Sequence, residues 1–281
     1  NGHDIGIGEA LRDHFEIGQP HPDFLKWWAN FSGDETLKAL TKSADRKALN
    51  DWLWGRQIAD IVAIAPKPIA GQDFCDHLKK LKPRLYSIAS SPKASPDEIH
   101  LTVSVLRHAR HGKSRKGVAS AFLADRAADE PVRVSVKKQA HFRPPADPET
   151  PAIMVGPGTG IAPFRAFLQD REAAGAGGPN WLFFGEQSRD SGYYYRDEIE
   201  AWLKGGLLTR FDTAFSRDQA EKIYVQHRMA ENGREIWNWL QDGAHFYICG
   251  DASRMAKDVD AALRAIAETH GGLSQAAAEG Y

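Results

Sequence analysis

Four short apolar segments recur at regular intervals in the second half of the chain. They are Ala152–Val155, Trp181–Phe184, Thr209–Phe215 and His245–Cys249, which begin 29, 28 and 36 residues apart. A helical pattern follows each segment, and this spacing is the length of a strand–helix unit. Buried strands that alternate with helices favour a parallel, doubly wound sheet, which binds ligands at the carboxyl ends of its strands. The pattern therefore predicts an α/β domain over residues 151–281.

The first eighty residues are predicted to be helical, because their apolar side chains recur at helical spacing. One helix is expected around Phe24–Phe31, behind the start signal at Pro22. A second is expected from Ser43 to Trp54, with Ser43 as its cap and Gly55 at its end. A third places three apolar residues on one face: Phe74, Leu78 and Leu81.

From Arg84 onward the apolar period changes to two, which is typical of strands. Strands are expected at residues 85–88, 100–106 and 132–136, with a short helix opening at Gly117–Leu123. Three strands are too few to close a barrel, so either part of this sheet lies outside this chain or it pairs with something else. The proline-rich segment 139–151 marks a boundary between domains at residues 1–145 and 151–281.

Composition excludes several classes of protein. The 36 Lys and Arg residues balance 37 Asp and Glu residues, which gives no reason to expect a nucleic-acid partner. The apolar runs fall short of the roughly 20 residues of a membrane helix. The two cysteines cannot build a disulfide framework, and no metal-ligand spacing is present, so no metal is expected. A reducing, cytoplasmic location is the simplest expectation.

A glycine-rich turn directly follows the first strand of the predicted sheet. Its sequence is Gly156-Pro157-Gly158-Thr159-Gly160, and a helix begins near Ile161. Glycines let backbone approach a phosphate, and the helix start offers free N–H groups and a positive dipole end. Turn glycines also serve structure alone, and the third position of a G-x-G-x-x-G fingerprint is Ile161 here. The turn is therefore a candidate pyrophosphate site with a structural alternative.

Polar residues follow the third strand of the predicted sheet. They are Ser216, Arg217, Lys222, Tyr224 and Gln226. A hydroxyl, a guanidinium and an ammonium at this edge suit a ribose 2′-phosphate, whereas NAD favours an acidic residue. Asp218 lies among them, and an exposed polar loop is the alternative interpretation.

The fourth strand ends in Cys249-Gly250-Asp251. A lone cysteine is commonly a small core residue, but at this edge Cys249 could instead lie against a nicotinamide. No partner for nucleophilic catalysis accompanies it, so hydride chemistry is the simplest use.

Two segments of the first half suit a flavin dinucleotide. Arg84-Leu85-Tyr86-Ser87 combines a cation, a ring and a hydroxyl on one predicted strand. Gly117-Val118-Ala119-Ser120 opens a helix, which suits a pyrophosphate.

Together these blocks resemble the diflavin branch of the ferredoxin–NADP reductase superfamily, and most closely the flavoprotein subunits of NADPH sulfite reductases. The blocks occur in the order of the superfamily: RLYSIASS, GPGTGIAPFRAF, WLFFGEQ, SRDQ and YICGDASRMAKDV. The resemblance implies a partial antiparallel β-barrel flavin domain with a helical insertion, whose upstream barrel strands are missing, followed by the doubly wound nucleotide domain. It also implies FAD and NADPH as cofactors, with FMN on a domain outside this chain.

The resemblance also implies the roles of individual residues. Ser87 and Cys249 would flank the nicotinamide during hydride transfer. The flavin and its phosphates would be held by Arg84, Tyr86, Ser87, Thr102, Ser104, Gly117, Val118, Ala119 and Ser120. NADPH would be held by Gly158, Thr159, Ser216, Arg217, Lys222, Tyr224, Gln226 and Asp251.

The implied function is transfer of a hydride from NADPH to FAD and of electrons through FMN to a haem protein. Departures are His108, where relatives commonly have Tyr, the absence of upstream barrel strands, and an end before the C-terminal Asp and the flavin-stacking aromatic. Two alternatives stay open: a nucleotide-binding fragment without turnover, and a single-flavin reductase that serves a separate flavodoxin.

A basic cluster between Arg107 and Lys116 is not explained by the resemblance. It contains five cations, two histidines and no acid. It is expected to be a solvated loop, and an electrostatic dock for an acidic FMN domain is the alternative.

Overall fold

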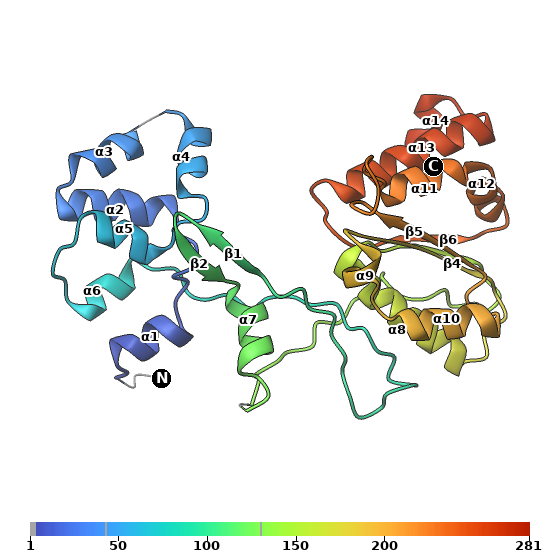
Figure 1. Cartoon of the computed structure of the whole chain (residues 1–281), viewed down its shortest axis with the longest axis horizontal. Helices are drawn as coiled ribbons and strands as arrows, with labels where there is room; N and C mark the ends of the chain where they lie inside the picture. Colours follow the sequence, from blue (N-terminus) through green and yellow to red (C-terminus); the bar gives the residue numbers. More distant parts are fainter. Residues whose placement is uncertain (1–3, 43, 130) are drawn as a thin grey trace. The chain divides into compact units, whose positions relative to one another are not determined.

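A computed structural model describes residues 4–42, 44–129 and 131–281 of the chain (Figure 1). The chain divides into two compact units, each formed from two stretches of sequence. The first unit comprises residues 1–85 and 105–133, and the second comprises residues 86–104 and 134–281. Each unit has a hydrophobic core of its own.

The second unit is built on a parallel four-stranded sheet, as predicted. Its strands are β3 (Ala152–Val155), β4 (Asn180–Glu186), β5 (Arg210–Phe215) and β6 (His245–Ile248). The spatial order is β5-β4-β3-β6. Strands β4 and β5 therefore follow on one side of β3, and β6 lies on its other side. All three neighbouring pairs are parallel, which brings the four carboxyl ends to one edge.

Helices cover both faces of this sheet (Figure 1). On one face Phe164 and Leu168 pack with Met154, and on the other Met229 and Ile236 pack with Ile153. Neighbouring residues of β3 thus enter opposite cores, which explains why the strand is apolar without interruption. The helical elements are η1 (Gly158–Ile161, a 3₁₀ turn), α8 (Ala162–Ala173), α9 (Arg189–Gly192), α10 (Arg196–Gly205), α11 (Val225–Glu231), α12 (Gly233–Gln241), α13 (Met255–Gly271) and α14 (Gln275–Gly280).

The first unit contains short helices around a core that includes Trp28 and Leu25. The helices are α1 (Ile7–Asp13), α2 (Pro22–Ser32), α3 (Glu35–Lys42), α4 (Arg46–Leu53), α5 (Ile58–Ile64), α6 (Gly71–Asp76) and α7 (Val118–Asp125). The predicted start of α2 at Pro22 is confirmed, and so is the predicted helix after Gly117.

Two details of the predicted helices need correction. Ser43 lies outside the described residues, and α4 is capped by Asp45, whose carboxylate accepts from the Ala48 N–H. The third predicted helix corresponds to α6, which ends at Asp76, before Leu78 and Leu81. The backbone beyond it bonds to an earlier segment, because Glu16 N donates to Lys79 O at 2.8 Å and Leu81 N donates to His14 O at 2.8 Å.

The predicted strands 85–88, 100–106 and 132–136 are not strands among the described residues. Only an isolated bridge between Ile88 and Leu101 forms there. Leu85 and Val134 are 77% and 75% exposed, so the apolar alternation has no neighbouring sheet to pack on. Alternation shows which face a strand would bury, but a strand also needs a partner for its backbone.

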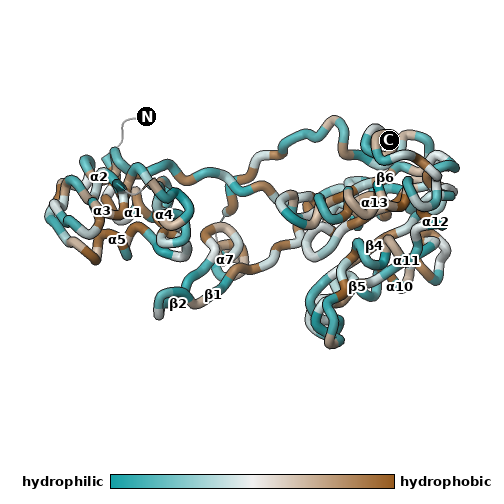
Figure 2. The backbone as a smooth tube through the Cα atoms, turned by 90° about the horizontal axis from the view of Figure 1, so that it is seen from above, coloured by the Kyte–Doolittle hydropathy of each residue, from teal (hydrophilic) through white to brown (hydrophobic). Residues whose placement is uncertain are grey.

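The basic cluster is a β-hairpin, and the expectation of a loop is wrong. Strands β1 (Arg107–Arg110) and β2 (Lys113–Lys116) pair antiparallel, and the tip is hydrophilic (Figure 2). Arg107 and Lys116 form ion pairs with Asp125, and Lys113 and Arg115 form ion pairs with Asp60. These contacts account for four of the five cations within the first unit; docking stays a prediction.

Asp60 anchors this hairpin, and its replacement is expected to destabilise the first unit. Burial by itself raises the pKa of Asp60, but hydrogen bonds from Lys113, the Gln57 N–H and Arg115 lower that pKa to about 2. The folded pKa lies below the unfolded value, so the stabilisation is present above about pH 4 and is lost between pH 4 and 2. We expect Asp60→Asn to lower the free energy of unfolding by about 2 kcal/mol at pH 7.

Urea unfolding followed by circular dichroism at pH 7 and at pH 3 checks this prediction. The difference between Asp60→Asn and the unsubstituted chain should narrow at the lower pH. Asp51→Asn, on the exposed side of α4, is the control with the same change of charge. An equal loss in both variants would contradict the anchoring role of Asp60.

No helix within the described residues is long and apolar enough to cross a membrane. The same residues contain no group of three or more His, Cys, Asp or Glu side chains that could hold a metal ion.

Candidate functional site

The glycine-rich turn lies at the carboxyl edge of the sheet, between β3 and α8, and its glycines have different tasks. A Cβ on Gly156 would lie 2.6 Å from the Phe164 ring, and one on Gly160 would lie 2.1 Å from Cys249 O. These two glycines permit close packing of the turn on α8 and on the end of β6. The structural alternative therefore explains two of the three glycines.

Gly158 is the glycine that leaves backbone accessible. Its φ of +57° lies in the left-handed region, and the nearest atom to a Cβ there would be Glu186 Oε2 at 3.6 Å. Gly158 and Thr159 are half-buried, and the 12-residue helix α8 begins after η1. An open turn at a helix start fits a phosphate group.

Ser87 and Cys249, which the resemblance places at the nicotinamide, lie together in the second unit. Cys249 follows β6, and its N–H donates to Val155 O at 3.0 Å. Burial raises the pKa of the Cys249 thiol, and a hydrogen bond with Ser87 acts in the opposite direction. The thiol is therefore neutral at physiological pH, which fits a contact residue rather than a thiolate nucleophile.

The predicted 2′-phosphate residues lie along one connection, from the end of β5 into α11. The start of this connection is fixed by the backbone, since Ser216 N donates to Glu186 O at 2.9 Å and Arg217 N donates to Gln187 O at 2.8 Å. Arg217 and Lys222 are exposed, and their side chains make no hydrogen bond or ion pair with other described residues. Two cations are thus available to an anionic group.

The remaining residues of this group have partners within the fold. Tyr224 caps α11, and Gln226 Nε2 donates to Asp258 Oδ2 at 3.4 Å. Asp251 accepts from Ser253 N at 2.8 Å, and the hydrogen bonds from Ser253 hold the pKa of its carboxyl below the usual range. Asp251 shapes the turn before α13.

The expected flavin residues fall in both units. In the first unit, Arg84 forms an ion pair with Glu16 at 2.6 Å, and Ser120 Oγ accepts from Leu106 N at 3.1 Å at the start of α7. In the second unit, Thr102 Oγ1 and the Tyr195 hydroxyl are hydrogen-bonded, and Ser104 is exposed. Tyr86 is half-buried. Contacts within each unit thus occupy Arg84, Ser120 and Thr102.

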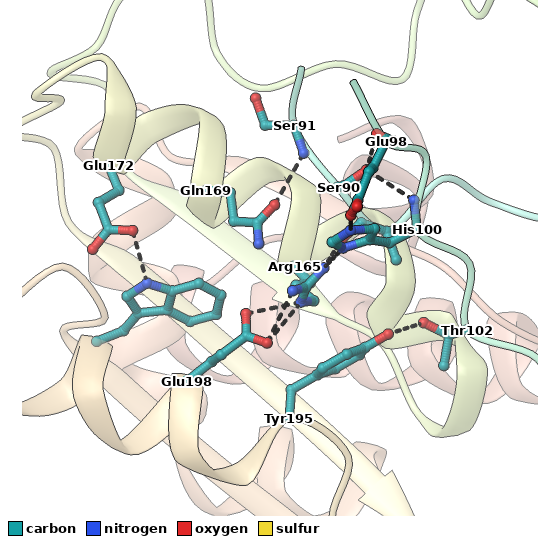
Figure 3. Close-up of polar contacts among 12 residues, drawn as sticks. Ser90, Ser91, Glu98, His100, Thr102, Arg165, Gln169, Glu172, Tyr195 and Glu198 are labelled. Carbon is teal, nitrogen blue, oxygen red and sulfur yellow. Dashed lines mark hydrogen bonds and ion pairs between the residues drawn. The ribbon is translucent and has the colours of Figure 1, made fainter. Parts of the chain in front are cut away.

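Two arginines at this edge were missed by the sequence reasoning. Arg189 lies 4.7 Å over the Phe215 ring, and its backbone N–H donates to Asp218 at 3.0 Å. Asp218 is therefore engaged by the turn after β4. Arg165 is buried in α8 and bonds to segment 86–104 (Figure 3). A signal for Arg165 existed, since a cation stands between Phe164 and Phe167 in an otherwise apolar helix start.

Comparison with known proteins supports the same division of tasks. The FAD binding domain family matches residues 3–122, and the oxidoreductase NAD-binding domain family matches residues 154–261. The chain is 47% identical over its whole length to the "Sulfite reductase [NADPH] flavoprotein alpha-component" of Serratia proteamaculans. The chain is thus similar over its whole length to this flavoprotein, and its two halves match an FAD-binding and an NAD-binding family.

Two further relatives show similar identity to the chain. The protein of the same name from a Shewanella strain is 49% identical to the chain over 99% of the chain's length. That of Yersinia enterocolitica is 47% identical over the whole chain. The chain covers 46–47% of the length of these relatives. The predicted resemblance is confirmed.

Proposed function

We propose that the protein is an NADPH-dependent, FAD-containing reductase that accepts a hydride from NADPH. The observation that carries this proposal is the contact of Ser87 with Cys249. It joins a segment expected to contact the flavin to the sheet edge expected to bind NADPH. Bound FAD would accept two electrons from the nicotinamide and release them singly.

The residues of the second unit fit NADPH. Gly158 offers an open turn before a helix, and Arg217 and Lys222 offer cations whose side chains have no partner among the described residues, which suits a 2′-phosphate. Thr159, Ser216, Tyr224, Gln226 and Asp251 are proposed to complete the nucleotide contacts. The chain's own task in the reaction is to orient the nicotinamide: Cys249 and Ser87 fix its place, and the neutral thiol takes no proton.

Flavin contacts are proposed for the residues that match the family pattern. Hydroxyls at Ser87 and Ser104 are exposed, and the helix α7 begins at Val118, so that its first N–H groups suit a pyrophosphate. The proposed set is Arg84, Tyr86, Ser87, Thr102, Ser104, Gly117, Val118, Ala119 and Ser120. We propose that the segments 85–88, 100–106 and 132–136 contribute strands to a flavin-binding barrel.

Partners are proposed from the names of the relatives. Those names describe an NADPH sulfite reductase flavoprotein component, and about half of each relative lies outside the region matched here. We propose an FMN domain in that remaining half, a haem protein as the acceptor of electrons, and a cytoplasmic location. Residues 1–145 and 151–281 are the proposed flavin and nucleotide domains.

The absorbance spectrum of the FAD-supplemented protein, before and after anaerobic addition of NADPH, tests the proposal. We expect the visible flavin band to bleach with NADPH and to change far less with NADH. Absence of both bound flavin and bleaching would contradict it and would favour a nucleotide-binding fragment without turnover. That alternative rests on the exposed apolar segments such as Val134–Val136. Detection of FMN bound to the native protein would exclude a single-flavin reductase that serves a separate flavodoxin.

A further inference from the structure

Segment 86–104 lies within the stretch that matches the FAD family, yet it belongs to the second unit. Most of it is exposed, but Ala89, Ser90 and Ser91 are 0%, 4% and 2% exposed. These three residues are therefore the point at which the segment is held against helix α8. Its neighbours, Tyr86 and Ser87, are the residues expected to contact the flavin.

Arg165 of α8 is the centre of this attachment (Figure 3). Its guanidinium donates to Ala89 O at 2.7 Å and to His100 Nδ1 at 3.1 Å. Arg165 therefore holds the segment at two points, one on each side of residues 90–99. Nε and Nη2 donate to the two carboxylate oxygens of Glu198, at 2.8 Å and 2.9 Å. Arg165 is 8% exposed, and a buried charge with this many partners is costly to remove.

The neighbouring side chains complete the attachment. The Tyr195 ring lies 4.7 Å from the Arg165 guanidinium carbon, and its hydroxyl is bonded to Thr102. One turn along α8, Gln169 Oε1 accepts from Ser91 N at 3.0 Å. Asp170 accepts from Ser91 Oγ and from Lys93 Nζ, each at 3.0 Å. Segment 86–104 is thus bonded along one face of α8 and to the start of α10.

The hydrogen-bonding chain also defines the state of His100. A guanidinium only donates, so Nδ1 of His100 accepts and carries no proton. Nε2 is then the protonated nitrogen, and it donates to Glu98 at 2.8 Å. Glu98 O in turn accepts from Ser90 Oγ at 3.5 Å, which gives a second link between the residues near Ala89 and those near His100.

Arg165 lies close to the glycine-rich turn at the start of α8. The same helix begins directly after the turn Gly158–Ile161, and Arg165 lies one helical turn from Ile161. One rigid element therefore carries both the turn expected to bind the nucleotide phosphates and the anchor of the segment expected to contact the flavin.

We propose that Arg165, supported by Glu198 and Tyr195, is a positioning group that keeps Ser87 against Cys249 and thereby sets the approach of the nicotinamide to the flavin. This role rests on the proposed function. Arg165 does not touch the reacting atoms, so its loss should leave nucleotide affinity intact and slow only the hydride step.

Hydrogen–deuterium exchange on the ligand-free chain tests the anchoring. We expect Arg165→Met to accelerate exchange in residues 86–104 by about tenfold, and the strands β3 and β4 to keep their protection. Arg165→Lys retains the charge but loses the bidentate bond to Glu198. Its exchange rate in residues 86–104 should lie between those of the unsubstituted chain and of Arg165→Met. The control is Arg264→Met, which removes a partly exposed guanidinium, paired with Asp260, from α13. Unchanged exchange in residues 86–104 would overturn the proposal.

Single-turnover reduction of the FAD-loaded protein by NADPH tests the positioning. We expect Arg165→Met and, more weakly, Tyr195→Phe to slow the reduction, by about tenfold for Arg165→Met, with unchanged affinity for 2′,5′-ADP. A parallel loss of 2′,5′-ADP affinity, or an unchanged rate, would overturn the positioning role. If the unsubstituted protein is not reduced by NADPH, the proposed function fails, and the exchange experiment still decides the anchoring.

Discussion

Arg217→Ala is expected to lower kcat/KM for NADPH by about 10- to 100-fold and to leave kcat/KM for NADH near its original value. The Arg217 side chain is exposed and has no partner among the described residues, while its backbone is fixed by the bond to Gln187 O. An unpaired guanidinium on a fixed backbone is well suited to a dianionic 2′-phosphate. NADH lacks that phosphate, so the loss of the guanidinium should not change kcat/KM for NADH.

Steady-state rates with both nucleotides at two ionic strengths provide the measurement. Salt should reduce the preference for NADPH in the unsubstituted protein more than in the variant, because the interaction is ionic. Arg234→Ala, on the exposed side of α12, removes the same charge from the same unit and should leave the preference unchanged. Equal losses with both nucleotides would show that Arg217 does not read the 2′-phosphate.

Cys249→Ala is expected to slow reduction of the flavin by NADPH by about 10- to 100-fold, with little change in nucleotide affinity. The thiol is neutral at physiological pH, because burial raises its pKa. We therefore propose that Cys249 fills the space beside the nicotinamide and holds Ser87. The rate in the unsubstituted protein should not depend on ionisation of this thiol near neutral pH, and Cys249→Ser should retain more activity than Cys249→Ala.

A double-mutant cycle with Ser87→Ala measures whether the two residues act together. The contact predicts that the double variant is less impaired than the product of the two single effects. Cys75→Ala is the control, because that cysteine is buried in the first unit. Independent effects of Ser87 and Cys249, or a large effect of Cys75→Ala, would contradict this assignment.

Much of the second unit could be predicted from its sequence. Strands such as Ala152–Val155 are apolar on both faces because helices cover both faces, and this pattern needs no knowledge of the partner strands. The strands expected at residues 85–88 and 132–136 failed for the opposite reason. An alternating segment shows which side chains could be buried, but only a neighbouring strand can satisfy its backbone.

The basic hairpin shows a related limit. The five cations within Arg107–Lys116 predict a solvated loop, because the carboxylate partners of four of them, Asp60 and Asp125, lie elsewhere in the sequence. A charge that is paired in the folded chain is indistinguishable in the sequence from one that is free. The same limit made Arg84 look available, whereas in the structure it is bonded to Glu16.

The sequence by itself determined the parallel sheet, the turn at Gly158, the cations after β5 and the family, because each depends on residues close together along the chain. Only the tertiary structure decided that Gly156 and Gly160 serve packing, that Cys249 meets Ser87, and that Arg165 anchors segment 86–104. Those three facts are contacts between elements, and a contact depends on how helices and strands pack, which local spacing does not specify.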